Sequence, residues 1–275
     1  MKKYIATVSF SAPIERTLWS IAKAGFDGVE LLFQDIENYD GSPAEVGKLC
    51  TDLGLQVIAL QPLRDFEGAP KFAEKIEEAK RAFEVMNDVG TDLTVLCSNV
   101  SPDIIYEPDL WIDQLQTLSE LAQSMGVRIA FEALSWGTFI NKFEAAAAVV
   151  QRVDHPSFGL ALDSFHTCAV SSNWSRLANI EPKKIFLTQL ADAPKRGGDL
   201  LSWSRNHRCF PGDGDFEVSR FADTISAMGY DGPYSFEVFS RELKEQPEGI
   251  VASNGMLAFL KLEEDLKVLL ARRGS

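Results

Sequence analysis

Strand-like and helix-like segments alternate along the whole of this chain, and this order restricts the folds that it can adopt. We predict eight strands, at residues 4–9, 28–33, 55–60, 92–97, 127–132, 158–163, 184–189 and 234–237. Helix-like segments separate them, at residues 12–24, 42–53, 70–89, 107–125, 141–153, 174–179 and 216–228, and a last helix covers 250–271. Alternating β and α units build a parallel sheet with right-handed crossovers. Eight units in 275 residues predict a closed (β/α)8 TIM barrel, a single α/β domain over residues 1–275.

The ends of the predicted helices carry the expected signals. Ser42 and Glu45 have the spacing of a capping box, and Gly25 and Gly90 follow helices where a C-cap glycine is expected. Asp215 is the expected N-cap of the helix at 216–228. An open doubly wound sheet is the alternative fold. No GxGxxG motif follows the first strand, which removes the usual dinucleotide-binding reason for an open sheet.

Composition and charge exclude several classes of protein. The net charge of −13 argues against nucleic-acid binding, which would need a basic surface. No apolar run reaches the roughly 18 residues of a membrane span, and the N-terminus lacks the features of a signal peptide. The four cysteines form no CxxC pair, which predicts free thiols. We therefore expect a cytoplasmic protein with no membrane or nucleic-acid partner.

Four consecutive predicted strands each end in one side chain that can bind a metal. These residues are Glu132, Asp163, Gln189 and Glu237. A barrel of parallel strands brings its strand C-termini to one face, so the four side chains are expected to converge there. Three carboxylates and a carboxamide favour a hard divalent cation such as Mg, Mn or Co. Gly159 and Ala161 share a strand face with Asp163, and their small size leaves room for an ion and a ligand.

His166 is the candidate acid/base residue. It follows Asp163 by three residues, just beyond the sixth predicted strand. An unperturbed histidine titrates near neutral pH, which suits proton transfer beside a carbonyl that a cation polarises. The alternative is that His166 only forms structural hydrogen bonds.

Arginines close to the predicted strand ends indicate an anionic small-molecule substrate, because a guanidinium group matches a carboxylate with two hydrogen bonds. Arg64 follows the third strand, and Arg205 and Arg208 lie in an irregular stretch at 191–214 that we expect to cover the site. Asn99, after the fourth strand, and His207, in the long stretch, are further candidates for ligand contact.

The strand-end pattern resembles the xylose-isomerase-like barrels, which include sugar isomerases, keto-sugar epimerases and endonuclease IV relatives. Within that group, six segments resemble the bacterial 3-dehydroshikimate dehydratases. They are QPLRDFEG (61–68), CSNVSP (97–102), EALSWG (132–137), LDSFHT (162–167), QLADAP (189–194) and SWSRNHRCFPG (202–212). The likeness covers nearly the whole chain.

The resemblance implies a lyase that dehydrates 3-dehydroshikimate to protocatechuate through a metal-stabilised enolate. Glu132, Asp163, Gln189 and Glu237 would bind the metal, and His166 would be the acid/base residue. It also implies that three residues hold the substrate, namely Arg64, Ser204 and Arg208. Isomerase and epimerase relatives usually have histidine where this chain has Gln189. Some dehydratases carry a second, dioxygenase-like domain, and we expect the single-domain form here.

Two other functions stay open at this point. The first is a keto-sugar or sugar-phosphate isomerase or epimerase, in which Glu132 or Glu237 would double as the base. The second is a ligand-binding barrel without catalysis, which the fold alone does not exclude. The identity of the metal, the acid or base role of His166, the pathway and the oligomeric state are not determined by the sequence, although a homo-oligomer is possible.

Overall fold

Eight parallel strands close into a barrel in the computed structural model, which describes residues 1–170 and 173–273. Residues 171–172 and 274–275 of the predicted domain lie outside the described part. The strands are β1 (Tyr4–Ala6), β2 (Gly28–Leu32), β3 (Gln56–Arg64), β4 (Leu93–Cys97), β5 (Arg128–Glu132), β6 (Phe158–Asp163), β7 (Ile185–Leu190) and β8 (Tyr234–Phe236). Each strand pairs with its neighbours in sequence, and β1 also pairs with β8. The predicted (β/α)8 TIM barrel is confirmed.

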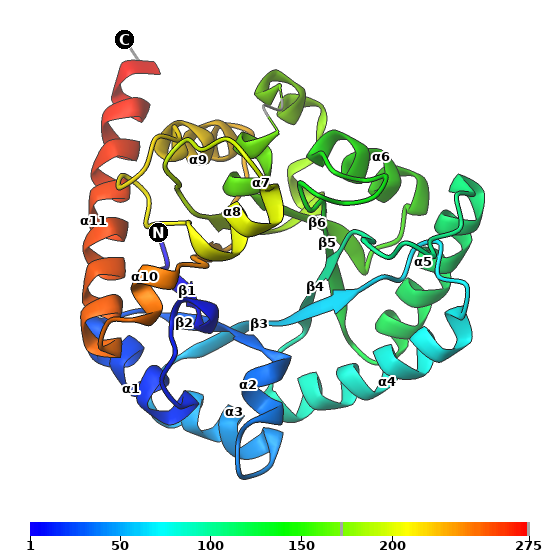
Figure 1. Cartoon of the computed structure of the whole chain (residues 1–275), viewed down its shortest axis with the longest axis horizontal. Helices are drawn as coiled ribbons and strands as arrows, with labels where there is room; N and C mark the ends of the chain where they lie inside the picture. Colours follow the sequence, from blue (N-terminus) through cyan, green and yellow to red (C-terminus); the bar gives the residue numbers. More distant parts are fainter. Residues whose placement is uncertain (171–172, 274–275) are drawn as a thin grey trace.

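Helices surround the barrel, as Figure 1 shows. The described residues form eleven α-helices: α1 (Ile14–Ala24), α2 (Phe33–Glu37), α3 (Pro43–Asp52), α4 (Phe72–Val89), α5 (Pro108–Ser124), α6 (Phe143–Val153), α7 (Ser164–Ala169), α8 (Leu200–Asn206), α9 (Val218–Ala227), α10 (Arg241–Lys244) and α11 (Glu248–Arg273). The same part of the chain has 3-10 helices η1 (Thr7–Ser9), η2 (Trp174–Asn179) and η3 (Pro182–Lys184).

The predicted end signals of α1, α3 and α4 act as expected. The Ser42 hydroxyl accepts a hydrogen bond from the Glu45 N–H, and the Glu45 carboxylate accepts one from the Ser42 N–H, so the capping box of α3 is formed. Gly25 and Gly90 end α1 and α4 with φ of 91° and 88°, in the left-handed region that glycine adopts without strain.

Apolar side chains form two layers. Residues that alternate along the strands pack inside the barrel, among them Ala59, Val95, Ala130, Ala161 and Leu187. A larger layer lies between the strands and the helices. Alanines fill several inner positions, so polar side chains have space above them.

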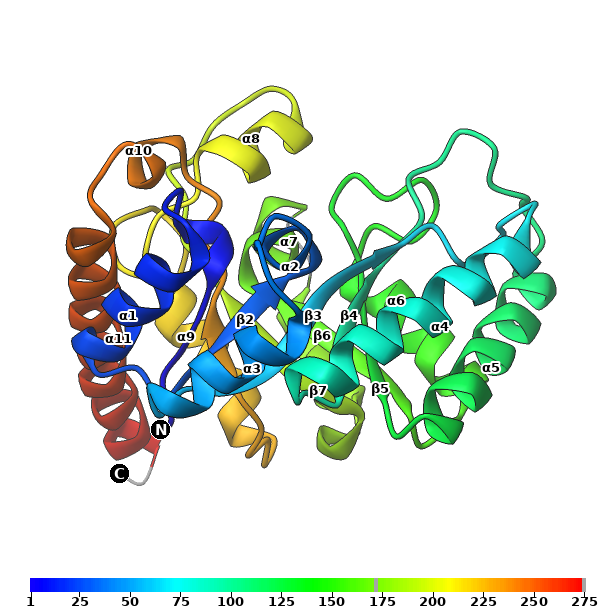
Figure 2. The ribbon, with the colours of Figure 1, turned by 90° about the horizontal axis from the view of Figure 1, so that it is seen from below.

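Four short helices lie at one end of the barrel. In Figure 2, α8 and α10 are at the upper end, with α2 and α7 below them, and both chain termini are at the opposite end. Helix α7 begins directly after β6, and α2 directly after β2, so this upper end is where the strands finish. The strand C-termini therefore face the end that α8 and α10 partly cover.

Several sequence-based expectations were wrong in detail. The first strand ends at Ala6, and the expected helix at 174–179 is a 3-10 helix. The stretch at 191–214, predicted as irregular, contains α8. Asp215 does not cap α9, because that helix begins at Val218 and the Asp215 carboxylate accepts a hydrogen bond from the Lys195 N–H. Short helices α2, α7 and α10 were not predicted, since each is too short for a hydrophobic period.

None of the helices in the described ranges has the length and apolar character needed to cross a bilayer. All four cysteines are unpaired, as predicted. The expected cytoplasmic location stays a prediction.

Candidate active site and metal centre

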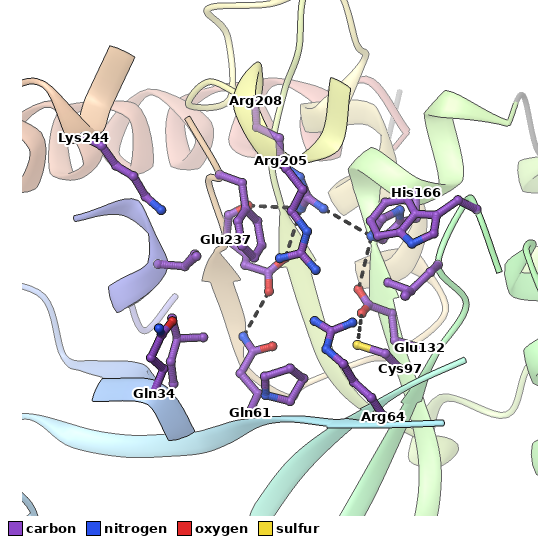
Figure 3. A pocket seen from close by; sticks show the side chains of 16 residues that line it. Gln34, Gln61, Arg64, Cys97, Glu132, His166, Arg205, Arg208, Glu237 and Lys244 are labelled. Atoms are coloured by element: carbon purple, nitrogen blue, oxygen red, sulfur yellow. Dashed lines mark hydrogen bonds and ion pairs between the residues drawn. The ribbon is translucent and has the colours of Figure 1, made fainter. Parts of the chain in front are cut away.

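A cavity of about 440 Å³ opens at the C-terminal end of the strands (Figure 3). Its walls combine acidic, basic and aromatic side chains from both halves of the barrel. The lining residues are Val8, Leu32, Gln34, Gln61, Pro62, Arg64, Cys97, Glu132, Leu134, Trp136, His166, Arg205, Arg208, Glu237, Phe239 and Lys244. Six of the predicted site residues are among them: Arg64, Glu132, His166, Arg205, Arg208 and Glu237.

The four predicted metal ligands come from four adjacent strands and are all buried. Glu132 ends β5, Asp163 ends β6, Gln189 lies near the end of β7, and Glu237 follows β8. One ligand atom each from Glu132, Asp163 and His166 lies within 4.8 Å of the others. The fold thus brings these carboxylates to the place where the strand-end pattern expects them.

Three buried side-chain oxygens at this centre have no hydrogen-bond partner among the residues that the structure describes: Glu132 Oε1, Gln189 Oε1 and Glu30 Oε1. A buried oxygen acceptor without a donor is costly, and a cation at the strand ends would satisfy the oxygens of Glu132 and Gln189. Asp163 and Glu237 are partnered, since both accept from Arg208. The oxygen-rich set of side chains fits a hard divalent cation.

Burial and mutual repulsion of the carboxyl groups shift their pKa values. Burial, together with the charges of Glu237 and Asp163, raises the pKa of Glu132 well above its ordinary value. Burial also raises the pKa of Glu237, against the opposing charge of Arg208. Burial alone would raise the pKa of Asp163, but Arg208 and His166 outweigh it and leave that pKa below its ordinary value. Additional positive charge at this centre would stabilise the ionised carboxylates.

Arg208 connects the acidic cluster to the histidine. Its Nη1 donates to Asp163 Oδ2 at 2.7 Å and to Glu237 Oε2 at 3.0 Å. Its Nη2 donates to the Ser204 hydroxyl at 2.7 Å and lies 3.2 Å from His166 Nε2. The Arg208 side chain is 1% exposed, so these contacts are formed away from bulk water. Ser204, one turn earlier on α8, therefore fixes Arg208 in the centre.

His166 is held in place by a helix cap and by the backbone of a neighbouring loop. Asp163 is the N-cap of α7, and its Oδ1 accepts from the N–H groups of Phe165 (2.5 Å) and His166 (3.3 Å). The Ser135 N–H donates to His166 Nδ1 at 3.2 Å. His166 Nε2 lies 3.8 Å from Glu132 Oε1 and from Asp163 Oδ2. Burial, reinforced by Arg208, lowers the pKa of His166 to about 3, so the imidazole is neutral at neutral pH.

Two arginines line the cavity beside aromatic rings. Arg64 ends β3 and Arg205 lies on α8, and Figure 3 shows both side chains pointing into the space between Glu237 and Glu132. The Arg205 guanidinium lies 4.6 Å from the centre of the Phe239 ring and 5.8 Å from that of Trp136. Burial and the charge of Arg64 lower the pKa of Arg205, as expected for two cations that share a site. Such a pair attracts an anionic group.

Three predicted substrate contacts do not line the cavity. Ser204 is buried beneath Arg208. The Asn99 amide donates to the Glu67 carbonyl at 2.7 Å and accepts from the Ser101 N–H at 2.7 Å, so it joins two loops. His207 forms an isolated β-bridge with Ser240. Direct substrate contact by these three residues stays a prediction.

Sequence reasoning missed two residues of the centre, Glu30 and Gln61. Glu30 lies inside β2 and is fully buried, and its carboxylate accepts hydrogen bonds from Gln61 and Gln189. The available signal was a single acidic residue within the apolar segment Gly28–Leu32, because such a side chain is seldom buried without a purpose. Gln61 left no comparable signal.

The barrel, its oxygen-rich strand ends and the histidine define a class of protein. The model of the family described as "Xylose isomerase-like TIM barrel" matches residues 20–260, and the chain belongs to that family.

Among its relatives, the chain is similar to two proteins named 3-dehydroshikimate dehydratase. The one from Pseudomonas aeruginosa is 44% identical over 275 residues, with 99% of this chain and 43% of that protein covered. The one from Pseudomonas putida is 40% identical, with 100% and 44% covered. A solved structure titled "xylose isomerase-like TIM barrel/4-hydroxyphenylpyruvate dioxygenase fusion protein" is 40% identical with a TM-score of 0.96, covering 100% of this chain and 44% of that one. The chain thus spans less than half the length of these relatives.

Proposed function

We propose that this barrel is a metal-dependent 3-dehydroshikimate dehydratase that forms protocatechuate and water. One observation carries the proposal: a single cavity is lined by two of the candidate metal ligands, Glu132 and Glu237, together with His166 and a pair of arginines. Each of these matches one chemical demand of the reaction. The two named dehydratases that resemble the full length of this chain support the choice of substrate.

The substrate is a carboxylated ring with a ketone and neighbouring hydroxyl groups. In the dehydration, a proton leaves the carbon beside the ketone, the bond to the β-hydroxyl breaks, water departs, and the ring tautomerises to the aromatic product. Glu132, Asp163, Gln189 and Glu237 would hold the divalent cation, Mg, Mn or Co. The cation would supply fixed positive charge where negative charge develops on the ketone oxygen.

The remaining residues perform the other tasks. His166 is the proposed acid/base residue because its Nε2 lies 3.8 Å from Glu132 Oε1 and from Asp163 Oδ2; it would take the proton at a ring nitrogen and return it to the departing hydroxyl. Arg64 and Arg205 bind the substrate carboxylate and turn the ring toward the centre. Trp136 and Phe239 provide flat walls for the ring. Arg208 and Ser204 keep Asp163, Glu237 and His166 in their relative positions.

A keto-sugar isomerase or epimerase is the competing activity on this barrel. A neutral sugar would leave the charges of Arg64 and Arg205 unmatched in the cavity. The cavity therefore favours an anionic substrate. Removing the metal separates the proposed enzyme from a binding protein without catalysis, because the binding protein would keep its ligand affinity whereas the enzyme would lose turnover.

A spectrophotometric assay tests the proposal. Purified protein is mixed with 3-dehydroshikimate and Mg, Mn or Co, and a chelator-treated sample is the control. We expect metal-dependent appearance of the protocatechuate absorbance. The folded protein showing no turnover with any of the three metals would reject the dehydratase proposal, and the keto-sugars would then be tested.

A further inference from the structure

A carboxyl group that no expected role accounts for lies directly under the metal centre. Glu30, in β2, is fully buried, and its Oε2 accepts hydrogen bonds from Gln61 Nε2 at 3.0 Å and from Gln189 Nε2 at 2.9 Å. A buried acidic group costs free energy unless it is well hydrogen-bonded, and an apolar side chain would pack in β2 at a lower cost. Packing alone therefore does not explain Glu30.

The hydrogen bond to Glu30 sets which end of the Gln189 amide faces the centre. A carboxamide has a donor end and an acceptor end, and only the oxygen can bind a cation. Because the NH2 group of Gln189 donates to Glu30, its oxygen lies on the other side, and that buried Oε1 has no partner within the described residues. Oε2 of Glu30 accepts whether or not Oε1 carries a proton, so the orientation does not depend on ionisation.

Gln61 extends the same control to a second ligand. Its Nε2 donates both to Glu30 Oε2 and to Glu237 Oε1, each at 3.0 Å. Figure 3 shows the Gln61 amide reaching from β3 toward Glu237. The contact leaves Glu237 Oε2 facing the centre, where Arg208 now contacts it. Glu30 thus orients Gln189 of β7 directly and Glu237, which follows β8, through Gln61.

We propose that Glu30 is a positioning residue for the cation site, which turns the Gln189 oxygen toward the metal and holds Glu237 through Gln61. The inference rests on the metal site of the proposed function. It accounts for the use of a carboxamide at this position, since a glutamine side chain becomes a defined ligand only when its amide is oriented from behind.

A Mn²⁺ titration tests this role without any assay of turnover. Chelator-stripped protein is titrated with Mn²⁺, and free Mn²⁺ is followed by its electron paramagnetic resonance signal. Glu30→Met keeps the bulk of the side chain but removes the acceptor, so we expect affinity to fall by about 10- to 100-fold. Glu30→Gln keeps an acceptor oxygen for both amides, and its affinity should stay close to that of the wild type.

Glu67→Met is the matched control. Glu67 is also a buried carboxyl group, but its Oε1 accepts from the Asn99 N–H rather than from a candidate ligand. This variant should lose stability in urea unfolding and retain its Mn²⁺ affinity. A purely structural Glu30 would behave in the same way.

The outcomes separate the two proposals. Wild-type protein that binds no Mn²⁺ would reject the metal site, and this inference with it. Wild-type protein that binds while Glu30→Met binds equally well would reject only the inference. If Glu30→Met does not fold, two other variants test the inference. It requires Glu30→Gln to bind Mn²⁺ with wild-type affinity and Gln61→Met to bind it more weakly. Wild-type affinity in Gln61→Met would overturn it.

Discussion

His166 shows how burial changes the protonation state of a side chain. It is 4% exposed, it lies beside Arg208, and desolvation outweighs the attraction of Asp163. The ring therefore stays neutral over the physiological range, where a solvent-exposed histidine would be partly protonated. Asp163, three residues earlier, fixes the backbone of this histidine through the cap of α7.

Replacing His166 tests the proposed acid/base role. We expect His166→Asn to lower kcat by about 10²- to 10⁴-fold, the usual range for removing a general acid or base, with a small change in Mn²⁺ affinity. His155→Asn is the control, since His155 lies in the turn before β6 and its ring accepts a hydrogen bond only from the Ser157 N–H among the contacts described. Steady-state kinetics with 3-dehydroshikimate measure both. An unchanged kcat in His166→Asn would remove His166 from the reaction.

Glu67 gives the protein a predictable dependence on pH. Burial raises the pKa of this carboxyl group from 4.5 to about 8, although the Asn99 N–H opposes the shift. Between these two values the folded protein holds a proton that the unfolded chain has released. Its contribution to stability is therefore present at low pH and lost as the pH rises through this window.

Glu67→Gln removes that titration. We expect the free energy of unfolding of wild type, relative to the variant, to decrease by on the order of a few kcal/mol between about pH 5 and about pH 8.5. Urea unfolding of both proteins at the two pH values measures the difference. A gap that does not change with pH would show that Glu67 is already ionised in the folded protein.

At the scale of elements, the segment after β7 decides how the site is covered. Helix α8 carries Ser204 and Arg205, and Arg208 follows it. Asp192, before α8, forms hydrogen bonds with residues that follow α8. Its Oδ2 accepts from the Gly212 N–H at 3.0 Å, its Oδ1 accepts from the Phe216 N–H at 2.9 Å, and its backbone bridges to Cys209. Arg208 is thus placed by an anchor outside the cavity.

Asp192→Ala should release this anchor. The change removes the acceptor of the partly buried Gly212 and Phe216 hydrogen bonds and of the buried Ala193 N–H, so we expect the free energy of unfolding to fall by about 1–3 kcal/mol. Because α8 loses its support, KM for 3-dehydroshikimate should rise. Asp213→Ala, at an exposed position of the same segment, is the control and should change stability by no more than about 0.5 kcal/mol. Equal kinetics in both variants would argue that α8 is held by other contacts.

At the scale of the whole molecule, the closure of the barrel depends on its first and last elements. β1 pairs with β8, and α11 packs against β8. Phe259 of α11 is fully buried and stacks on Phe236 of β8, with ring centres 3.8 Å apart, and its ring also contacts Phe26. Glu237 follows Phe236 directly, so the same packing supports a candidate metal ligand.

Phe259→Ala should lower the free energy of unfolding by about 3–5 kcal/mol, the usual cost of deleting a buried aromatic ring. Leu257→Ala is the matched control, since Leu257 is 64% exposed on the same helix, and about 0.5 kcal/mol or less is expected. Urea unfolding of the two variants gives the comparison. Similar losses would mean that α11 contributes through its exposed face.

The net charge of the whole molecule and the charges that line the cavity differ in sign. The chain carries a net charge of −13, yet Arg64, Arg205 and Lys244 line the cavity. Screening in salt limits the reach of distant surface charges to roughly 10 Å, so the field inside the cavity is set by the groups that line it, these cations on one side and Glu132 and Glu237 on the other. An acidic protein can therefore select an anionic substrate.

The sequence by itself determined the order of strands and helices, and with it the barrel. Hydrophobic periodicity and caps such as Ser42 and Gly25 are local, so they can be recognised in isolation. The convergence of Glu132, Asp163, Gln189 and Glu237 also followed, because a closed parallel barrel places all strand C-termini at one end. Asp163 and His166 are three residues apart, and their proximity was likewise readable from the chain.

Only the tertiary structure decided how these groups act on one another. Glu30 and Gln189 are 159 residues apart, and their hydrogen bond exists because closure of the barrel turns both side chains inward at one level. The two amide side chains have different roles because their hydrogen-bond partners lie on other elements. Asn99 joins two loops through Glu67, whereas Gln189 faces the centre with its NH2 group on Glu30. A hydrogen bond depends on distance and direction between atoms, and for residues far apart in sequence these are set only when the chain has folded.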